Sequence, residues 1–234
     1  MTQENKRAAY KIYMILATLF ITALVVSNLI FQKFFYWYPF HLELFGTKLF
    51  EISVGILPYP ITFLLTDLIS EIYGRKNANQ VVLIGLFASV FSLGIVYLAN
   101  VVPATSWSPV SDDLFSTVFG NTATAVFASM LAYLFAQFID IQIYHFWKRL
   151  TQGKHLWIRN NFSTFSSQLV DTLTILLLLC YFNVIAWENF WGLLLSGFLF
   201  KVLVAIFDTP FLYLGVYLMR KRFNLEMNEE IEFV

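Results

Sequence analysis

Charged and amide side chains recur within segments of this sequence that are otherwise as apolar as a membrane span. One such segment, LPYPITFLLTDLISEIYG at residues 57–74, contains two prolines, two carboxylates and several hydroxyl groups. An acid at the centre of a bilayer is costly unless it faces protein or a water-filled cavity. The residue types therefore predict a polar pocket enclosed by membrane-spanning segments.

Asp67 and Glu71 are the two acids of this segment, and their i,i+4 spacing places them on one face of a helix. Counted from Gly74 at about 1.5 Å per residue, Glu71 lies roughly 5 Å and Asp67 roughly 12 Å inside the membrane boundary. Asp67 is too short to reach water from that depth and is expected to face the pocket. For Glu71 two interpretations stay open: a surface ion pair with Arg75, which is favoured, or a place in the pocket.

Two later segments repeat a pattern in which an amide is followed by an acid three residues on. Gln137 and Asp140 occur in AQFID, and Gln168 and Asp171 occur in SQLVD. The i,i+3 spacing places each pair on one helix face, at a depth of roughly 12–14 Å. Both pairs are therefore predicted to face the same interior as Asp67.

The first and last apolar segments add further polar groups. The last carries Lys201 and Asp208 two turns apart, and the first carries Ser27 and Asn28. A single intramembrane acid can be an isolated hydrogen-bonding group in a packed core. Several acids at similar depth, together with one lysine, favour the lining of a shared pocket.

Two prolines precede these acids in the second apolar segment. Each lacks a backbone N–H and clashes with the preceding helical turn. The second helix is therefore predicted to be kinked or broken at Pro58 and Pro60. A half-helix that begins near Pro60 would direct free N–H groups into the interior, whereas a simple kink would only shape the packing.

The composition determines the class of protein that must position these side chains. Hydrophobic residues make up 59% of the chain and charged residues 13%, whereas soluble domains average roughly 25% charged residues. The single cysteine, Cys180, excludes an internal disulfide. We predict an all-α integral membrane protein in which residues 1–234 form one polytopic domain of six transmembrane helices. The predicted spans cover residues 10–31, 49–73, 80–102, 122–146, 163–187 and 190–219.

Basic residues are distributed unequally over the segments between these spans. Only Lys33 and Lys48 fall on the side opposite the termini. This asymmetry predicts that both termini are cytoplasmic, in a cell membrane, or in the inner membrane if the host has two. Residues 103–120 would then lie outside, where Ser111, Asp112 and Asp113 could cap a short interfacial helix. The acidic tail NLEMNEEIEFV is expected to be solvated. The basic residues on the side of the termini are Lys6, Arg7, Lys11, Arg75, Lys76, Lys148, Arg149, Lys154, Arg159, Arg220, Lys221 and Arg222.

Several of these segments resemble the queuosine-precursor transporters of the vitamin-uptake-transporter group. They occur in family order across nearly the whole membrane domain. Their sequences are SN at 27–28, PYPITFLLTDLISEIYG at 58–74, AQFIDIQIYHFWKRLT at 136–151, LWIRNNFSTFSSQLVDT at 156–172 and FKVLVAIFDTPFLYLGVYL at 200–218.

The resemblance implies import of 7-deazaguanine bases and a six-helix fold similar to the substrate-binding components of energy-coupling-factor vitamin transporters. Ala136 departs from the glycine that the family pattern leads us to expect before Gln137. Glu71 and Asp208 are not positions where an acid is expected throughout the family. The substrate-binding positions that the resemblance carries over are Asn28, Asp67, Gln137, Asp140, Gln168, Asp171 and Lys201.

The chemistry of a 7-deazaguanine fits these residue types. Its ring N–H and exocyclic amine are adjacent donors that a carboxylate, here Asp67, can accept together. Its carbonyl oxygen needs a donor such as Lys201, which would also neutralise a pocket carboxylate, either Asp171 or Asp67. Its flat face can stack on an aromatic ring. Other planar, donor-rich bases would meet the same groups, so the residues alone indicate a substrate class.

We therefore expect a self-sufficient transporter that is not an enzyme, that needs no cofactor and that binds a small-molecule 7-deazaguanine in the lipid bilayer. No nucleic-acid partner is expected, whereas homo-oligomerisation and the energy source are left open. One alternative is a substrate-binding subunit of an energy-coupling-factor transporter, for which Ala23 and Ser27 offer a weak small-residue pair. Another alternative is an intramembrane aspartyl protease that uses Asp140 and Asp171, but neither acid lies in a Gly-x-Gly-Asp sequence. A membrane scaffold would leave the buried charges unexplained.

Overall fold

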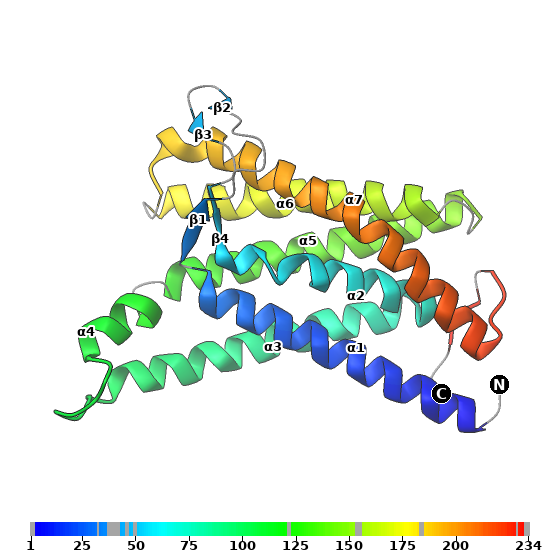
Figure 1. Ribbon diagram of the computed structural model, residues 1–234, viewed down its shortest axis with the longest axis horizontal. Helices are drawn as coiled ribbons and strands as arrows, with labels where there is room; N and C mark the ends of the chain where they lie inside the picture. The colour runs from blue at the N-terminus through cyan, green and yellow to red at the C-terminus, as the bar shows by residue number, and fades with distance from the viewer. Residues whose placement is uncertain are drawn as a thin grey trace.

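The computed structural model is a bundle of long helices with small antiparallel strand pairs at one end (Figure 1). It describes residues 3–31, 33–36, 43–44, 47–48, 51–120, 123–152, 156–182, 185–227 and 229–231. Predicted features at Leu49, Thr122, Lys154 and 232–234 therefore lie outside the described residues. The long helices are α1 (Gln3–Ile30), α2 (Tyr59–Ile72), α3 (Gly74–Val101), α5 (Ala123–Leu150), α6 (Leu156–Tyr181) and α7 (Phe190–Phe223).

Short elements connect the long helices. Strand β1 (Phe34–Tyr36) pairs antiparallel with β4 (Glu51–Ser53), and β2 (Glu43–Leu44) pairs antiparallel with β3 (Thr47–Lys48). A 3₁₀ turn, Val54–Ile56, leads from β4 into α2, and a second, Trp187–Asn189, leads into α7. Both chain termini lie at the opposite end of the bundle from the strands (Figure 1). We call this the terminal end.

Length and apolarity identify an all-α membrane protein. Within the described residues, five helical segments are long and apolar enough to cross a membrane: Gln3–Ile30, Val54–Ile72, Gly74–Val101, Asn161–Tyr181 and Trp187–Phe223. Helix α5, with 28 residues, covers most of the fourth predicted span. That the chain crosses the membrane six times stays a prediction.

Helix α2 is the central helix of the bundle (Figure 1). In the apolar 18-residue stretch of the span Val54–Ile72, which contains α2, 59% of the residues are buried, against 22–44% in the other four candidate spans. A helix surrounded by protein can carry polar side chains at membrane depth, because neighbouring helices rather than lipid contact them. This explains why the acids of the 57–74 segment are tolerated.

The prolines mark the start of α2 and do not kink a longer helix. Pro58 is the N-cap residue and Pro60 lies in the first turn, where a missing N–H breaks no helical hydrogen bond. The start of α2 at Tyr59 agrees with the half-helix expected to begin near Pro60. The prediction that the second helix already begins at about residue 49 was wrong, since β4 and a 3₁₀ turn occupy residues 51–56. Gly55 in that turn approaches α1 so closely that a Cβ would lie 2.6 Å from the carbonyl oxygen of Ser27.

Two predictions about the segments outside the long helices had opposite outcomes. The predicted cap at Ser111 is confirmed, because its side chain accepts the N–H of Leu114 at 3.3 Å at the start of α4 (Asp112–Phe115). The prediction that the acidic tail is only solvated was wrong. Ile231 is 4% exposed, and its N–H donates to the carbonyl of Ile72 at 2.8 Å. An apolar side chain in that tail can be buried against the ends of the helices, which a count of acidic residues does not reveal.

Candidate functional site

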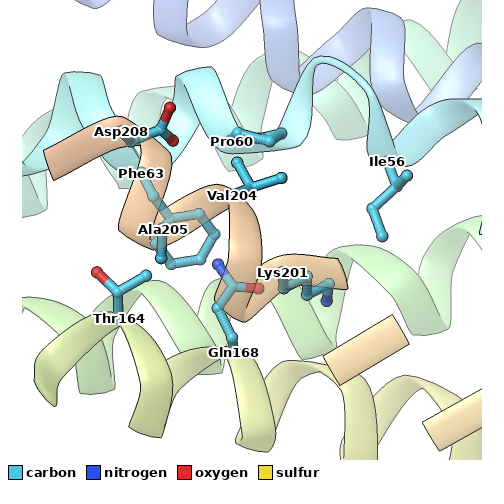
Figure 2. Close-up of a pocket in the computed structure, with 9 residues that line it drawn as sticks. All are labelled: Ile56, Pro60, Phe63, Thr164, Gln168, Lys201, Val204, Ala205 and Asp208. Atoms are coloured by element: carbon cyan, nitrogen blue, oxygen red, sulfur yellow. The ribbon is translucent and has the colours of Figure 1, made fainter. Parts of the chain in front are cut away.

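A cavity of about 260 Å³ lies between α2, α6 and α7. Figure 2 shows Gln168 extending from α6 toward α7, with Phe63 of α2 nearby. Gln168 Oε1 and Thr164 Oγ1 are both buried and have no hydrogen-bond partner among the described residues. Buried polar atoms are normally paired, so unpaired ones that line a cavity indicate that a ligand or water completes them. The lining residues are Ile56, Pro60, Phe63, Thr164, Gln168, Lys201, Val204, Ala205 and Asp208.

Lys201 forms a buried ion pair beside this cavity. Its Nζ lies 2.5 Å from Asp171 Oδ2 and 3.0 Å from Thr172 Oγ1. The side chains of Lys201 and Asp171 are 10% and 5% exposed. The prediction that Lys201 pairs with an intramembrane carboxylate is confirmed, with Asp171 as the partner. The pair is neutral as a whole, which is how a charge is tolerated at this depth.

Asp67 and Asp140 form a second polar layer, one helical turn beyond Phe63 along α2. Both carboxyls are buried, at 3% and 0% exposure. Ser167 of α6 also donates to Asp140 Oδ1 at 2.9 Å. The predicted convergence of Asp67 and Asp140 is therefore seen, but in a packed layer and not on the cavity wall.

Gln137 belongs to the same layer. It is fully buried, and its side-chain oxygen accepts the hydroxyl of Thr66 at 3.4 Å, while its amide nitrogen donates to the hydroxyl of Tyr133. These contacts join α2 to α5. Gln137 and Gln168 have the same sequence pattern, yet one crosslinks helices and the other faces the cavity.

Glu71 does not pair with Arg75. Its Oε1 lies 2.6 Å from Arg220 of α7, and its Oε2 lies 3.1 Å from the hydroxyl of Tyr144 and 3.8 Å from Lys148 Nζ, both of α5. The favoured prediction was wrong because α2 ends at Ile72 and the chain turns at Gly74 with φ of +83°. Residues 71 and 75 therefore belong to different helices, and i,i+4 geometry does not apply to them.

Asn28 lies apart from the Lys201 cavity. It lines a smaller cavity of about 190 Å³ between α1, α3 and α5, together with Ser89. Asn28 Nδ2 and Ser89 Oγ are buried and have no partner among the described residues. The structure thus separates Asn28 from the other predicted site residues. Its further lining residues are Leu24, Val82, Leu86, Met130, Tyr133 and Leu134.

Comparison with known proteins identifies the relationship. The model of a family described as "Putative vitamin uptake transporter" matches residues 53–215. The chain belongs to this vitamin uptake transporter family.

Two curated relatives agree with this assignment. A protein of Bacillus subtilis (strain 168) is 28% identical over 172 residues, which cover 73% of each chain. A protein of Haemophilus influenzae (strain ATCC 51907 / DSM 11121 / KW20 / Rd) is 26% identical over 186 residues, which cover 75% of each chain. Both are named "Probable queuosine precursor transporter". No solved structure matches.

The matched segment of this vitamin uptake transporter family member contains the whole Lys201 cavity and the Asp67–Asp140 layer, whereas Asn28 and the tail lie outside it. Within the described residues, no group of three His, Cys, Asp or Glu side chains could hold a metal ion. The polar interior of the described residues consists of a cavity with unpaired polar atoms beside a packed hydrogen-bonded layer.

Several residues of the site were not found by reasoning from the sequence. Thr164 could have been found, because Thr164, Gln168 and Asp171 follow i, i+4, i+7 spacing on one face of α6. Phe63 had no such signal among 26 phenylalanines. The contacts of Arg220, Lys148 and Tyr144 with Glu71 also had none, because they join helices far apart in the sequence.

Proposed function

We propose that this protein imports 7-deazaguanine bases, the queuosine precursors, into the cytoplasm. The observation that carries the proposal is the pair of unpartnered polar atoms, Gln168 Oε1 and Thr164 Oγ1, on the wall of a cavity that also contains Lys201 and Phe63. A ligand that binds there must offer hydrogen-bond donors and a flat apolar face. A 7-deazaguanine offers both.

Each cavity residue has a role in this proposal. Gln168 Oε1 accepts an N–H of the base, and the ammonium of Lys201 donates to its carbonyl oxygen. Phe63 supplies a ring for stacking. Asp208, on the cavity wall, is placed to accept the paired N–H donors or to bind an aminomethyl cation on the base. Asp67, first expected to contact the base, lies in the layer behind Phe63 and supports the wall.

The names of the two relatives supply the specific substrate class, since the residues by themselves would also accept other planar bases.

Transport by this chain alone is favoured over a role as the binding subunit of a larger transporter. The small-residue pair that could have received a partner helix includes Ser27, which is 4% exposed and whose carbonyl meets Gly55. A residue covered by its own chain cannot form such a contact. The pairing of Asp171 with Lys201 likewise gives no support to a proteolytic dyad of Asp140 and Asp171.

The decisive experiment is uptake by a cell that cannot make the precursor and expresses only this chain. Queuosine in tRNA is the readout, after feeding with a 7-deazaguanine. Appearance of queuosine in the tRNA only when the chain is expressed supports the proposal. Its absence, with the protein present in the membrane, contradicts it.

The cytoplasmic position of both termini is part of the proposal. Reporter fusions at Glu4, Asp112 and Glu230 are expected to place only Asp112 outside, because the basic residues gather at the terminal end. An external reporter at Glu230 would contradict an even number of crossings.

A further inference from the structure

A second polar assembly lies at the terminal end of the bundle, two turns along α2 from the cavity. It consists of Glu71 from α2, Tyr144 and Lys148 from α5, Arg220 from α7 and Glu230 from the tail. We call it the terminal-end network. None of these residues was expected to meet another, and Arg220 and Glu230 lie outside the family match.

Opposite charges face one another in the network. Arg220 lies 2.6 Å from Glu71, and Lys148 lies 2.8 Å from Glu230 and 3.8 Å from Glu71. The side chains of Glu71 and Lys148 are only 0% and 8% exposed. Two acids thus balance two bases, and loss of Glu230 would leave one buried cation in excess. Such an excess is costly in a low-dielectric interior.

The tail has a specific seat on the helix ends. Asn224 adopts left-handed backbone geometry with φ of 56° at the end of α7. Beyond this reversal, Ile231 is buried and bonds to the backbone of Ile72. A Cβ on Gly74 would lie 2.2 Å from Glu230 Oε2, and Gly74 has φ of +83°. Only glycine suits both the turn and the seated tail.

The position of the network affects how a solute leaves the cavity. Phe63 on the cavity wall, Asp67 and Glu71 follow one another at i,i+4 spacing along α2. From Phe63 to Glu71 the helix rises about 12 Å. Both α2 and α7 line the cavity, and the network joins these two helices to α5 and the tail at the terminal end. A solute that leaves the cavity along α2 toward that end meets this network.

We propose that the terminal-end network, with the tail seated on it, is the gate that closes the cytoplasmic end of the transport pathway. The direction assigned to it rests on the proposed function and on the orientation proposed with it. In the closed gate, Glu230 neutralises Lys148, and Glu71 holds Arg220. Release of the tail unbalances the charges and allows α2, α5 and α7 to separate.

The test measures access to a buried position on α2 and needs no substrate. Ser70 lies between Asp67 and Glu71, is 1% exposed, and its hydroxyl has no partner among the described residues. A Cys180→Ala background removes the only native cysteine, and Ser70→Cys introduces the reporter thiol. A membrane-impermeant maleimide is then applied to inside-out vesicles, and the rate of labelling is measured.

Three variants are compared in this background: Glu230→Gln, a stop codon at Glu226, and Glu229→Gln as the matched control. Glu229 is exposed, and its carboxylate accepts the backbone N–H of Glu226 within the tail at 2.9 Å. We expect labelling to be about fivefold faster with Glu230→Gln and about tenfold faster after truncation, because each shifts the closed–open equilibrium. Glu229→Gln should label like the parent.

Several outcomes would overturn the proposal. One is equally slow labelling of all variants, and another is equal acceleration by Glu229→Gln. Faster labelling only in right-side-out vesicles would place the gate on the other side of the membrane. If the truncated chain fails to insert, Glu230→Gln decides alone, with its size-exclusion profile as the check on folding. If uptake fails but labelling is accelerated as expected, the proposed substrate is contradicted and the proposed gate is still supported.

Discussion

The Lys201 cavity and the terminal-end network use the same helices and similar residue types in different ways. Both contain a base from α7 paired with an acid from another helix: Lys201 with Asp171 and Arg220 with Glu71. In the cavity, polar atoms of Gln168 and Thr164 are left without partners. In the network, Glu71 has three partners and no exposed surface. Unpaired polar atoms characterise a place for a ligand, and a saturated set of charges characterises a closed contact between helices.

Replacement of Lys201 should have the largest effect on function. Lys201→Met leaves the buried Asp171 carboxylate without its cation and removes the proposed donor to the base. Breaking a buried pair costs about 3–5 kcal/mol, so we expect uptake to be abolished while the protein still inserts. The double variant Lys201→Met, Asp171→Asn removes the unpaired charge. It should regain stability without regaining uptake if Lys201 contacts the substrate.

Lys221→Met is the control for that experiment, because Lys221 is an exposed residue of the same helix. It should transport like the parent. Normal uptake by Lys201→Met would mean that Lys201 does not contact the substrate. The functional difference between the cavity and the network would then be lost.

Replacement of Glu71 should reduce stability more than binding. Glu71→Gln removes the charge that holds Arg220 and Lys148, at an expected cost of about 3 kcal/mol in the free energy of unfolding. Arg75→Gln, on an exposed side chain at the start of α3, should change it by less than about 0.5 kcal/mol. Thermal unfolding in detergent measures both. Equal effects of the two substitutions would support the surface ion pair between Glu71 and Arg75 that the sequence favoured.

The two glutamines allow the same contrast with one type of substitution. Gln168→Leu removes an unpartnered polar atom from the cavity, so affinity for a 7-deazaguanine should fall about tenfold with little loss of stability. Gln137→Leu breaks the bonds with Thr66 and Tyr133 and should lower stability by about 1–3 kcal/mol. Binding and unfolding measured on the same purified variants separate the two. A reversal of the pattern would place the ligand in the Asp67–Asp140 layer.

Asn28→Ala should have the smallest effect. Asn28 faces a separate cavity with Ser89, so uptake is expected to change by less than about twofold. The resemblance had placed Asn28 with the substrate-binding residues. A large loss of uptake in the auxotrophic cell would restore that assignment and show that the two cavities act together.

The outcome at Lys201 and at Glu71 shows how far local patterns determine contacts. A single base at membrane depth needs an acid, and Asp171 was one of only two candidates considered. At Glu71 the favoured partner was a sequence neighbour, but the chain turns at Gly74 between the two residues. Sequence proximity predicts contact only while one regular helix continues. The prolines left two interpretations open, because a helix start and a kink have the same sequence signature.

The sequence by itself determined the membrane class and the approximate place of each long helix. These follow from hydropathy and charge, which belong to each residue and its close neighbours along the chain. Only the tertiary structure decided which Q-x-x-D amide faces the cavity, which base holds Glu71 and where the acidic tail rests. Those contacts depend on how each helix is rotated and tilted against the others. Arg220 and Glu71 meet across 149 residues of sequence, a separation over which no local pattern carries information.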